Sequence, residues 1–331
     1  MNKVCIFGAG AVGGYMAAHL ARAGVDVSVV ARGAHLAAIR RDGLRFIGPD
    51  GEFTVRVPAS DHPADLGPQD VVISTLKAHG LPPAASSIRT LLAPGTPVVF
   101  AVNGIPWWYL ARLNGGTSVG SRLDPEDTLA REVGLARTLG CVIRSPNEVV
   151  APGVVRNNSR TSSFMVGEPD GALSPRLEQV VALLRRGLPG AVATRDIGRE
   201  IWGKLLLNVP SSLLSSLTQS PSSALFADAS TRELYARLAR ETCAVAARYG
   251  ATLEFDLDGQ IAATGSNPHP PSMLQDLLAG RPLELDAQLF AVQDLARSAG
   301  VETPMLDVML PLLAHRARAR SSAVGEERVP L

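Results

Sequence analysis

Cysteine is scarce in this chain of 331 residues, and neither charge sign is in excess. Cys5, Cys141 and Cys243 are odd in number and far apart, so neighbouring cysteines cannot build a disulfide framework or a CxxC zinc or redox site. The 32 basic and 31 acidic side chains leave a net charge of +1, without the basic excess typical of nucleic-acid binding. We expect a reduced, cytoplasmic protein with no nucleic-acid partner.

Long apolar runs are missing as well. Residues 90–111 and 205–227 carry no charged side chain, but both contain prolines and polar residues, and the second contains seven serines. A membrane-spanning helix needs about 20 mostly apolar residues. A glycine-rich segment begins at Gly8, which leaves no space for a signal peptide. We therefore expect no membrane partner.

Several catalytic patterns are absent, namely HExxH, Walker A and GxSxG. This excludes the commonest zinc-protease, nucleotide-triphosphate and serine-hydrolase signatures. Five histidines show no ligand spacing, and we expect them to be surface or hydrogen-bonded side chains: His19, His35, His62, His79 and His315. We expect no metal site.

Short apolar runs alternate with helical patterns over the first hundred residues. The runs lie at 4–7, 27–30, 71–75 and 98–102, and the helical patterns near 12–23, 35–41 and 84–92. This rhythm is typical of a parallel sheet with crossover helices. A Pro-Asp-Gly turn signal at 49–51 predicts an inserted hairpin. Residues 117–170 are expected to add strands and loops to the same domain.

The pattern changes after Asp196. Apolar residues recur at helical spacing through 197–217, 230–250, 256–264, 272–279, 284–299 and 304–316. The fold class predicted is α/β, with a Rossmann-type doubly wound parallel sheet over 1–195 and an all-helical domain over 196–331. The arginine-bearing tail after Ala314 is expected to be frayed. The apolar faces of these helices could pack in the core or form the interface of a homodimer.

The clearest motif is Gly8-Ala9-Gly10-Ala11-Val12-Gly13, directly after a predicted strand and before a predicted helix. In this context Gly8 permits a tight turn, Gly10 lets the backbone approach a pyrophosphate, and Gly13 lets helix and strand pack closely. The free N–H groups of the helix N-terminus would hold the anion. The motif predicts dinucleotide binding; the alternative is a glycine-rich turn without a ligand.

Arg32 follows the second strand, where an NAD site usually has a carboxylate that accepts from the ribose 2′-hydroxyl. A guanidinium can instead bind a 2′-phosphate through charge-assisted hydrogen bonds. Arg32 therefore favours NADP (NADPH) as the cofactor, unless it is an ordinary solvated arginine. Lys77 and Asn103 follow two further strands, at the sheet edge where ligands bind. Taken alone, Lys77 could equally be an ordinary loop lysine, and Asn103 could equally be part of an Asn-Gly turn.

In the helical half, Lys204 and Asn208 are four residues apart and share one helix face. Apolar neighbours would partly desolvate Lys204 and lower its pKa, which suits proton transfer. The alternative is an exposed ion pair with Glu200. Further on, Ser272 and Gln275 have the spacing of a capping box, and Glu284 is an ordinary first-turn carboxylate on its own.

Together these segments resemble the ketopantoate reductase (2-dehydropantoate 2-reductase) family. The resemblance rests on GAGAVG, the arginine after the second strand, TLKA, VNG, a Trp-x-Lys-x-x-x-Asn helix, and SMLQD followed by a glutamate, in that order over nearly the whole chain. It implies NADPH-dependent reduction of ketopantoate, in pantothenate and coenzyme A synthesis.

The resemblance also implies residue roles. Lys204 would protonate the carbonyl oxygen, Glu284 would position the lysine and the cofactor side, and Asn103 would lie near the nicotinamide and substrate. Asn208 and Ser272 would bind the substrate's oxygens. Ser212 stands in the pocket where family members often carry a second asparagine, and Ser222 and His269 also replace expected asparagines. The large aromatic side chains of Trp107, Trp108 and Tyr109 follow the Asn-Gly turn and are a further departure.

These departures keep alternatives open. Lost hydrogen bonds to a substrate can change discrimination by orders of magnitude, so another 2-oxo acid or related carbonyl compound is the nearest rival substrate. A non-catalytic NADP-binding regulator is the alternative from another functional class.

Overall fold

The computed structural model describes residues 1–117, 121–265 and 269–326, with side chains to Arg320. The chain divides into two compact units, Met1–Ile197 and Gly198–Leu331. Unit 1 holds the strands β1 (Lys3–Phe7), β2 (Asp26–Val30), β3 (Leu44–Gly48), β4 (Gly51–Val55), β5 (Ala59–Ser60), β6 (Val71–Ser74), β7 (Val98–Phe100), β8 (Thr138–Arg144), β9 (Asn147–Ala151), β10 (Val154–Asn157), β11 (Ser163–Gly167) and β12 (Ala191–Ala193). Its helices are α1 (Ala11–Arg22), α2 (Gly33–Asp42), α3 (Ala85–Arg89), α4 (Trp107–Leu113), α5 (Thr128–Glu132) and α6 (Pro175–Arg185), with 3-10 turns η1 (Pro63–Leu66), η2 (Ala78–Gly80), η3 (Pro82–Ala84) and η4 (Leu135–Arg137).

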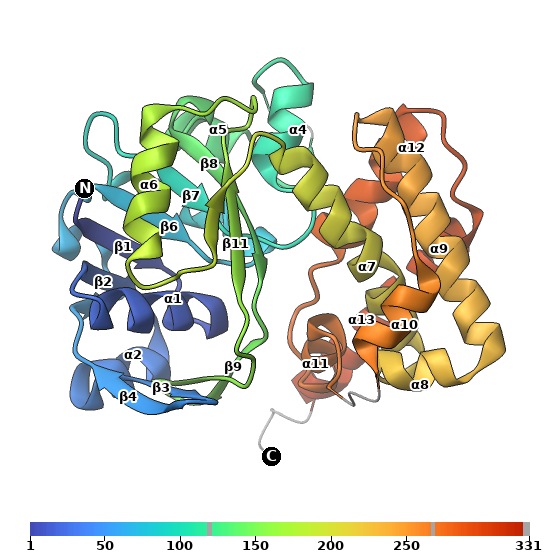
Figure 1. Cartoon of the computed structure of the whole chain (residues 1–331), viewed down its shortest axis with the longest axis horizontal. Helices are drawn as coiled ribbons and strands as arrows, with labels where there is room; N and C mark the ends of the chain where they lie inside the picture. Colours follow the sequence, from blue (N-terminus) through green and yellow to red (C-terminus); the bar gives the residue numbers. More distant parts are fainter. Residues whose placement is uncertain (118–120, 266–268, 327–331) are drawn as a thin grey trace. The chain divides into compact units, whose positions relative to one another are not determined.

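The main sheet of unit 1 has the strand order β12-β11-β8-β7-β6-β1-β2-β5 (Figure 1). From β5 to β8 every neighbouring pair is parallel, and β11 is antiparallel to β8. The order reverses between β1 and β6, which is the switch point of a doubly wound sheet, where ligands bind beyond the carboxyl ends of the strands. The predicted fold class is confirmed.

A second sheet, with the order β4-β3-β10-β9, packs against α1. The predicted hairpin at 49–51 forms its β3–β4 pair, with Gly48 opposite Gly51. β10 pairs in parallel with β3, although the two strands are about a hundred residues apart in the chain. This pairing brings residues 147–157 beside the first half of unit 1.

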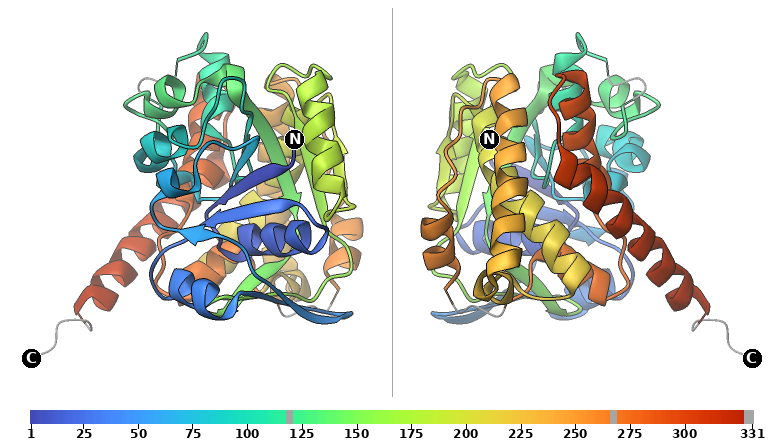
Figure 2. Two further views of the ribbon diagram at one scale, coloured as in Figure 1. Left: turned by 90° about the vertical axis from the view of Figure 1, so that its left-hand side faces the viewer. Right: turned by 90° about the vertical axis from the view of Figure 1, so that its right-hand side faces the viewer.

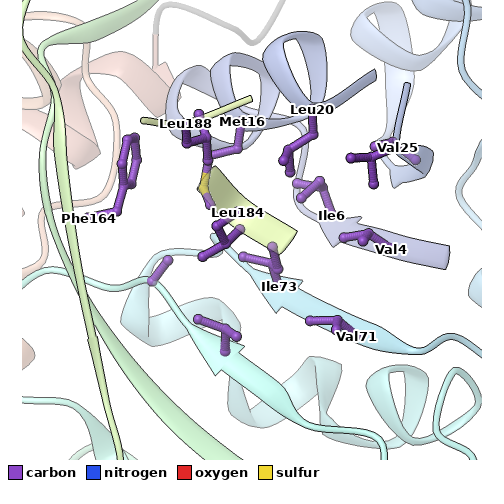
Figure 3. Close-up of a cluster of buried hydrophobic side chains, with 14 of the residues drawn as sticks. Val4, Ile6, Met16, Leu20, Val25, Val71, Ile73, Phe164, Leu184 and Leu188 are labelled. Atoms are coloured by element: carbon purple, nitrogen blue, oxygen red, sulfur yellow. The ribbon is translucent and has the colours of Figure 1, made fainter. Parts of the chain in front are cut away.

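The main core lies where α1 and α6 cover one face of the sheet. Val4 and Ile6 of β1 contribute to it together with Met16 of α1, and Leu184 and Leu188 close it from α6 and the loop after it (Figure 3). All five are fully buried. Apolar side chains at helical spacing on α6 form this contact, and Ser174 caps the helix by accepting a hydrogen bond from the Leu177 N–H at 3.2 Å. The core holds β1 and α1, and therefore the turn between them, in place.

The described residues of unit 2 form helices joined by loops, with no strand among them, as predicted. It contains α7 (Ile197–Thr218), α8 (Ser222–Ala227), α9 (Ala229–Arg248), α10 (Leu257–Thr264), α11 (Ser272–Leu278), the π-helical turn η5 (Asp286–Phe290), α12 (Ala291–Ser298) and α13 (Pro304–Glu326). Within the described ranges, no helix is both long and apolar enough to cross a membrane.

The expectation that the chain frays after Ala314 is wrong. α13 continues to Glu326 as one long helix (Figure 2). Alanine and arginine favour helix, and two arginines anchor this one. Arg316 donates to the Leu217 carbonyl of α7, and Arg320 donates to the Leu278 carbonyl of α11 at 3.0 Å.

Candidate active site

The glycine-rich turn joins β1 to α1 at the carboxyl edge of the sheet. Gly8 has φ +105°, a conformation that side chains rarely adopt. A Cβ on Gly13 would lie 2.1 Å from the Gly8 carbonyl oxygen, and Thr75 Oγ1 donates to that oxygen at 2.5 Å. The fold itself therefore requires glycine at 8 and 13.

Gly10 is different. Its φ is −68°, and a Cβ added there would meet nothing within 4 Å. The first helical hydrogen bond of α1 runs from the Gly14 N–H to the Gly10 oxygen at 2.7 Å, so the N–H groups just before it have no partner within the helix. Neither backbone nor packing requires glycine at 10; the space beside it is open to a ligand, next to N–H groups suited to an anion.

A pocket of about 480 Å³ borders this turn. Gly8, Ala9 and Gly10 line it, together with Arg32, His35 and Val149. The described residues that line it include no carboxylate. The pocket therefore combines an anion-binding helix start with a cationic side chain, which fits the phosphates of a dinucleotide.

Arg32 is exposed and precedes α2 as its N-cap residue. Lys77 follows β6, and Asn103 follows β7; both are half-buried. Since β2, β1, β6 and β7 are parallel neighbours, the structure brings these residues to one edge of the sheet with the glycine-rich turn. Lys77 is not among the residues that line the pocket, although Leu76 and Gly80 are.

Lys204, Asn208 and Ser212 follow one another at four-residue spacing on α7. Lys204 and Asn208 are half-buried, while Ser212 is buried at 3% exposure. Pro210 lies inside this helix and has no N–H to donate to the Leu206 carbonyl. The three polar side chains therefore share one face of α7, and Ser222 begins the next helix, α8.

Glu284 lies just before the π-helical turn η5 and is 8% exposed. Gln288, 1% exposed, donates from Nε2 to Glu284 Oε2 at 3.2 Å, and its backbone N–H donates to the Glu284 carbonyl at 3.1 Å. Single π-helical turns are rare and frequent at functional sites. Sequence analysis missed Gln288, although its four-residue spacing from Glu284 was a usable signal.

The predicted capping box at Ser272 is wrong. The Gln275 N–H donates to the Pro271 carbonyl at 3.0 Å, which makes Pro271 the N-cap and Ser272 the first helical residue. The Gln275 side chain bonds the Pro270 carbonyl and meets His269 Nε2 at 3.1 Å. The Ser272 hydroxyl is therefore exposed at the start of α11 rather than engaged as a cap.

Among the histidines, His19 differs from the expectation, whereas His35 is hydrogen-bonded as expected. The His19 ring makes a tilted contact with Tyr15 and edge-on contacts with Phe46 and Phe53. Its Nε2 is buried with no hydrogen-bond partner among the described residues, so it is neither a surface nor a hydrogen-bonded histidine. Burial, with a smaller contribution from Arg22, lowers its pKa to about 4. His35 bonds through both ring nitrogens, but it lines the pocket, a place the sequence did not indicate.

The three aromatic side chains at 107–109 are buried. Trp107, Trp108 and Tyr109 are at most 4% exposed, and Trp107 packs edge-on against Phe100 within unit 1. Among the described residues, no cluster of three or more His, Cys, Asp or Glu could hold a metal ion.

Comparison with known proteins places this geometry in a family. The family model described as "Ketopantoate reductase PanE/ApbA" matches residues 4–171, and the model of the C-terminal part of the same family matches residues 196–317. The chain belongs to the ketopantoate reductase family. A 2-dehydropantoate 2-reductase of Mesorhizobium japonicum is 41% identical over 324 residues, which are 96% of this chain and 98% of that protein.

Solved structures agree with this family membership. A chain of Ralstonia solanacearum described as a candidate ketopantoate reductase superposes with TM-score 0.88 at 37% identity, covering 96% of this chain and 98% of that one. A D-mandelate dehydrogenase shares the fold at TM-score 0.81 and 21% identity, covering 96% and 99%. The family assignment makes this protein an oxidoreductase acting on CH–OH and C=O groups, dependent on a pyridine nucleotide.

Proposed function

We propose that this protein uses NADPH to reduce the 2-oxo group of 2-dehydropantoate to (R)-pantoate, in pantothenate and coenzyme A biosynthesis. The observation that carries the proposal is the pocket of unit 1, with an open space at Gly10, a helix N-terminus beside it and Arg32 at its wall. Full-length similarity to a curated 2-dehydropantoate 2-reductase supports the substrate.

NADPH, when bound, supplies a hydride to the 2-oxo carbon. The N–H groups around Ala11, Val12 and Gly13 would hold its pyrophosphate. Arg32 would bind the 2′-phosphate, because a guanidinium is favoured there and the described residues that line the pocket include no carboxylate to repel the phosphate. Lys77 and Asn103, at the same sheet edge, would contact the cofactor, Asn103 towards the nicotinamide.

Lys204 is assigned as the general acid. Hydride addition to the carbonyl carbon leaves negative charge on its oxygen, and the Lys204 ammonium both stabilises this charge and transfers a proton to it. Only three of the chain's 32 basic residues are lysines: Lys3, Lys77 and Lys204. Arginine does not release its proton in proteins, so the lysine on α7 supplies a group that the other basic residues of unit 2 cannot.

The remaining polar side chains are assigned to positioning and binding. Glu284 would orient the Lys204 ammonium and contact the cofactor. Asn208, Ser212 and Ser272 would hydrogen-bond the substrate's hydroxyl and carboxylate oxygens, and the exposed hydroxyl of Ser272 is compatible with this role. We assign the enzyme to the cytoplasm, and analytical ultracentrifugation would show whether it is a homodimer.

A different 2-oxo acid or related carbonyl compound is the second candidate. The D-mandelate dehydrogenase of the same fold was solved with NADH and anilino(oxo)acetate, so the fold alone selects neither the substrate nor the nucleotide. Ser212 and Ser222 are the side chains to which we attribute any such change, because a serine hydroxyl reaches less far than an amide. A non-catalytic NADP-binding regulator is disfavoured by the presence of both Lys204 and Glu284.

The test is a substrate screen that follows oxidation of NADPH and, separately, NADH. We expect ketopantoate with NADPH to give the highest kcat/KM, above 2-oxoisovalerate and bulkier 2-oxo acids. A much higher kcat/KM for another 2-oxo acid would replace the substrate but keep the mechanism. Nucleotide binding without turnover of any carbonyl compound would favour the regulator.

A further inference from the structure

His35 makes two hydrogen bonds at the wall of the pocket. It lies in the first turn of α2, three residues after Arg32. Its Nε2 is 2.6 Å from the Ala9 carbonyl oxygen, and its Nδ1 is 2.9 Å from the Gly153 backbone nitrogen. One ring therefore links the glycine-rich turn to the turn between β9 and β10.

These partners determine where the proton of the ring lies. The Gly153 N–H can only donate, so Nδ1 must accept. The proton of the neutral ring is then on Nε2, where it donates to the Ala9 carbonyl. Both nitrogens have the partners they need in this single tautomer.

The bond to Ala9 completes a set of contacts that hold the glycine-rich turn. The N–H groups of Gly8 and Ala9 both donate to the Val30 carbonyl at 3.0 Å, and the Gly8 carbonyl accepts from Thr75. His35 holds the remaining carbonyl of this pair. With these groups fixed, the turn presents the N–H groups at the start of α1, rather than a carbonyl oxygen, to a phosphate.

The bond to Gly153 acts on a second segment beside the pocket. Gly153 has φ +74° and lies in the turn between β9 and β10. β9 carries Val149, which lines the same pocket although it is 45% exposed. The position of this segment is thus tied to the position of the turn.

We propose that His35 is a positioning residue of the dinucleotide site, which holds the Ala9 carbonyl so that the phosphate-binding turn is preorganised. The inference rests on the proposed function only in that the pocket binds NADPH. His35 bonds backbone groups of Ala9 and Gly153 within unit 1, whereas the proposed proton donor is Lys204. Its loss should therefore weaken binding and leave the chemical step intact.

The experiment measures the Kd of NADPH by fluorescence titration of the full-length chain. His35→Leu removes both hydrogen bonds. Of these, the proposal assigns the effect on binding to the bond with the Ala9 carbonyl, whose loss corresponds to about tenfold weaker binding. His35→Gln can still reach the Ala9 carbonyl, whereas His35→Asn can reach only the Gly153 N–H. His62→Leu, a change of an exposed histidine away from the pocket, is the matched control.

The proposal predicts about tenfold weaker binding in His35→Leu and His35→Asn, near-normal binding in His35→Gln and in the control, and unchanged kcat at saturating NADPH. Normal binding by His35→Leu, or recovery in the Asn variant but not in the Gln variant, would overturn it. Failure of the wild-type chain to bind NADPH would instead refute the proposed cofactor. Should His35→Leu fold poorly, the comparison of Gln with Asn still decides the question.

Discussion

Gln288 donates a hydrogen bond from its buried Nε2 to Oε2 of Glu284 at 3.2 Å. This is a side-chain bond that the structure shows to a residue proposed for catalysis, and it restrains a carboxylate that is itself 8% exposed. A side-chain hydrogen bond contributes about 0.5–1.5 kcal/mol. Gln288 therefore helps to set which way the Glu284 carboxylate faces.

We expect Gln288→Leu to lower kcat about tenfold, with a smaller change in the KM for NADPH, because the Glu284 carboxylate loses the hydrogen bond from Gln288 Nε2. Gln293 is the matched control: it is also buried and donates from Nε2 to a carboxylate, that of Asp307, at 2.5 Å. Steady-state kinetics and thermal unfolding of Gln288→Leu and Gln293→Leu separate the two effects. If both variants lose kcat equally, Gln288 serves only stability.

Gly10 gives a second prediction. Since its φ suits alanine and a Cβ would meet nothing within 4 Å, Gly10→Ala should keep the thermal stability of the chain or raise it, by about 0.4–1 kcal/mol. Its NADPH Kd should rise at least about tenfold, because the methyl group occupies space reserved for the pyrophosphate. Gly13→Ala is the contrast, since its Cβ would clash with the Gly8 carbonyl and should destabilise the fold. Unaltered NADPH binding by Gly10→Ala would show that the ligand lies elsewhere.

Arg32 gives a third prediction, on nucleotide choice. Arg32→Ala should weaken NADPH binding by about 10- to 100-fold and leave NADH binding nearly unchanged, because only NADPH carries the 2′-phosphate. The control is Arg40→Ala, on the same helix, whose guanidinium donates to the Ala59 carbonyl and lies near Asp61. Titration with both nucleotides is the measurement. Equal losses for the two would mean that Arg32 does not contact the 2′-phosphate.

The buried position of His19 should make the stability of the folded chain fall at acidic pH. Its folded pKa of about 4 lies below the ordinary 6.5, so the unfolded chain binds the extra proton between these values. The stability contributed by neutral His19 is therefore complete above about pH 6.5 and is lost as the pH falls towards 4. After allowance for its partial exposure, we expect a loss of about 1–2 kcal/mol.

Urea unfolding across this pH range checks the prediction. His19→Leu should lose less stability than the wild-type chain over the same range, because leucine has no proton to bind. Identical pH dependence in wild type and His19→Leu would contradict the assignment.

The local parts of the fold were predictable from the sequence. The alternation of strands and helices, the glycine-rich turn and the hairpin at 49–51 depend on neighbouring residues, whose side-chain pattern is read directly. The pairing of β10 with β3 was not predictable, because it joins distant strands and depends on tertiary packing. The predicted capping box failed because the Gln275 N–H, which the motif pairs with the Ser272 hydroxyl, donates to the Pro271 carbonyl instead.

The candidate site divides in the same way. Arg32 and Lys204 stand out because their residue type is unexpected at those positions. Gln288 and His35 act through a partner, Glu284 or the Ala9 carbonyl, and such roles become visible only when the partner's position is known. The sequence therefore indicated Arg32 and Lys204 but neither Gln288 nor His35.

The central claim is that the ammonium of Lys204 supplies the proton, and the kcat of Lys204 variants tests it most directly. Lys204→Ala should lower kcat at least about 100-fold while the Kd of NADPH stays near the wild-type value. Lys204→Arg should be similarly slow, because arginine keeps the charge but does not release its proton. Lys3→Ala, in unit 1, is the control and should be fully active. A kcat for Lys204→Ala close to that of the wild type would contradict the account.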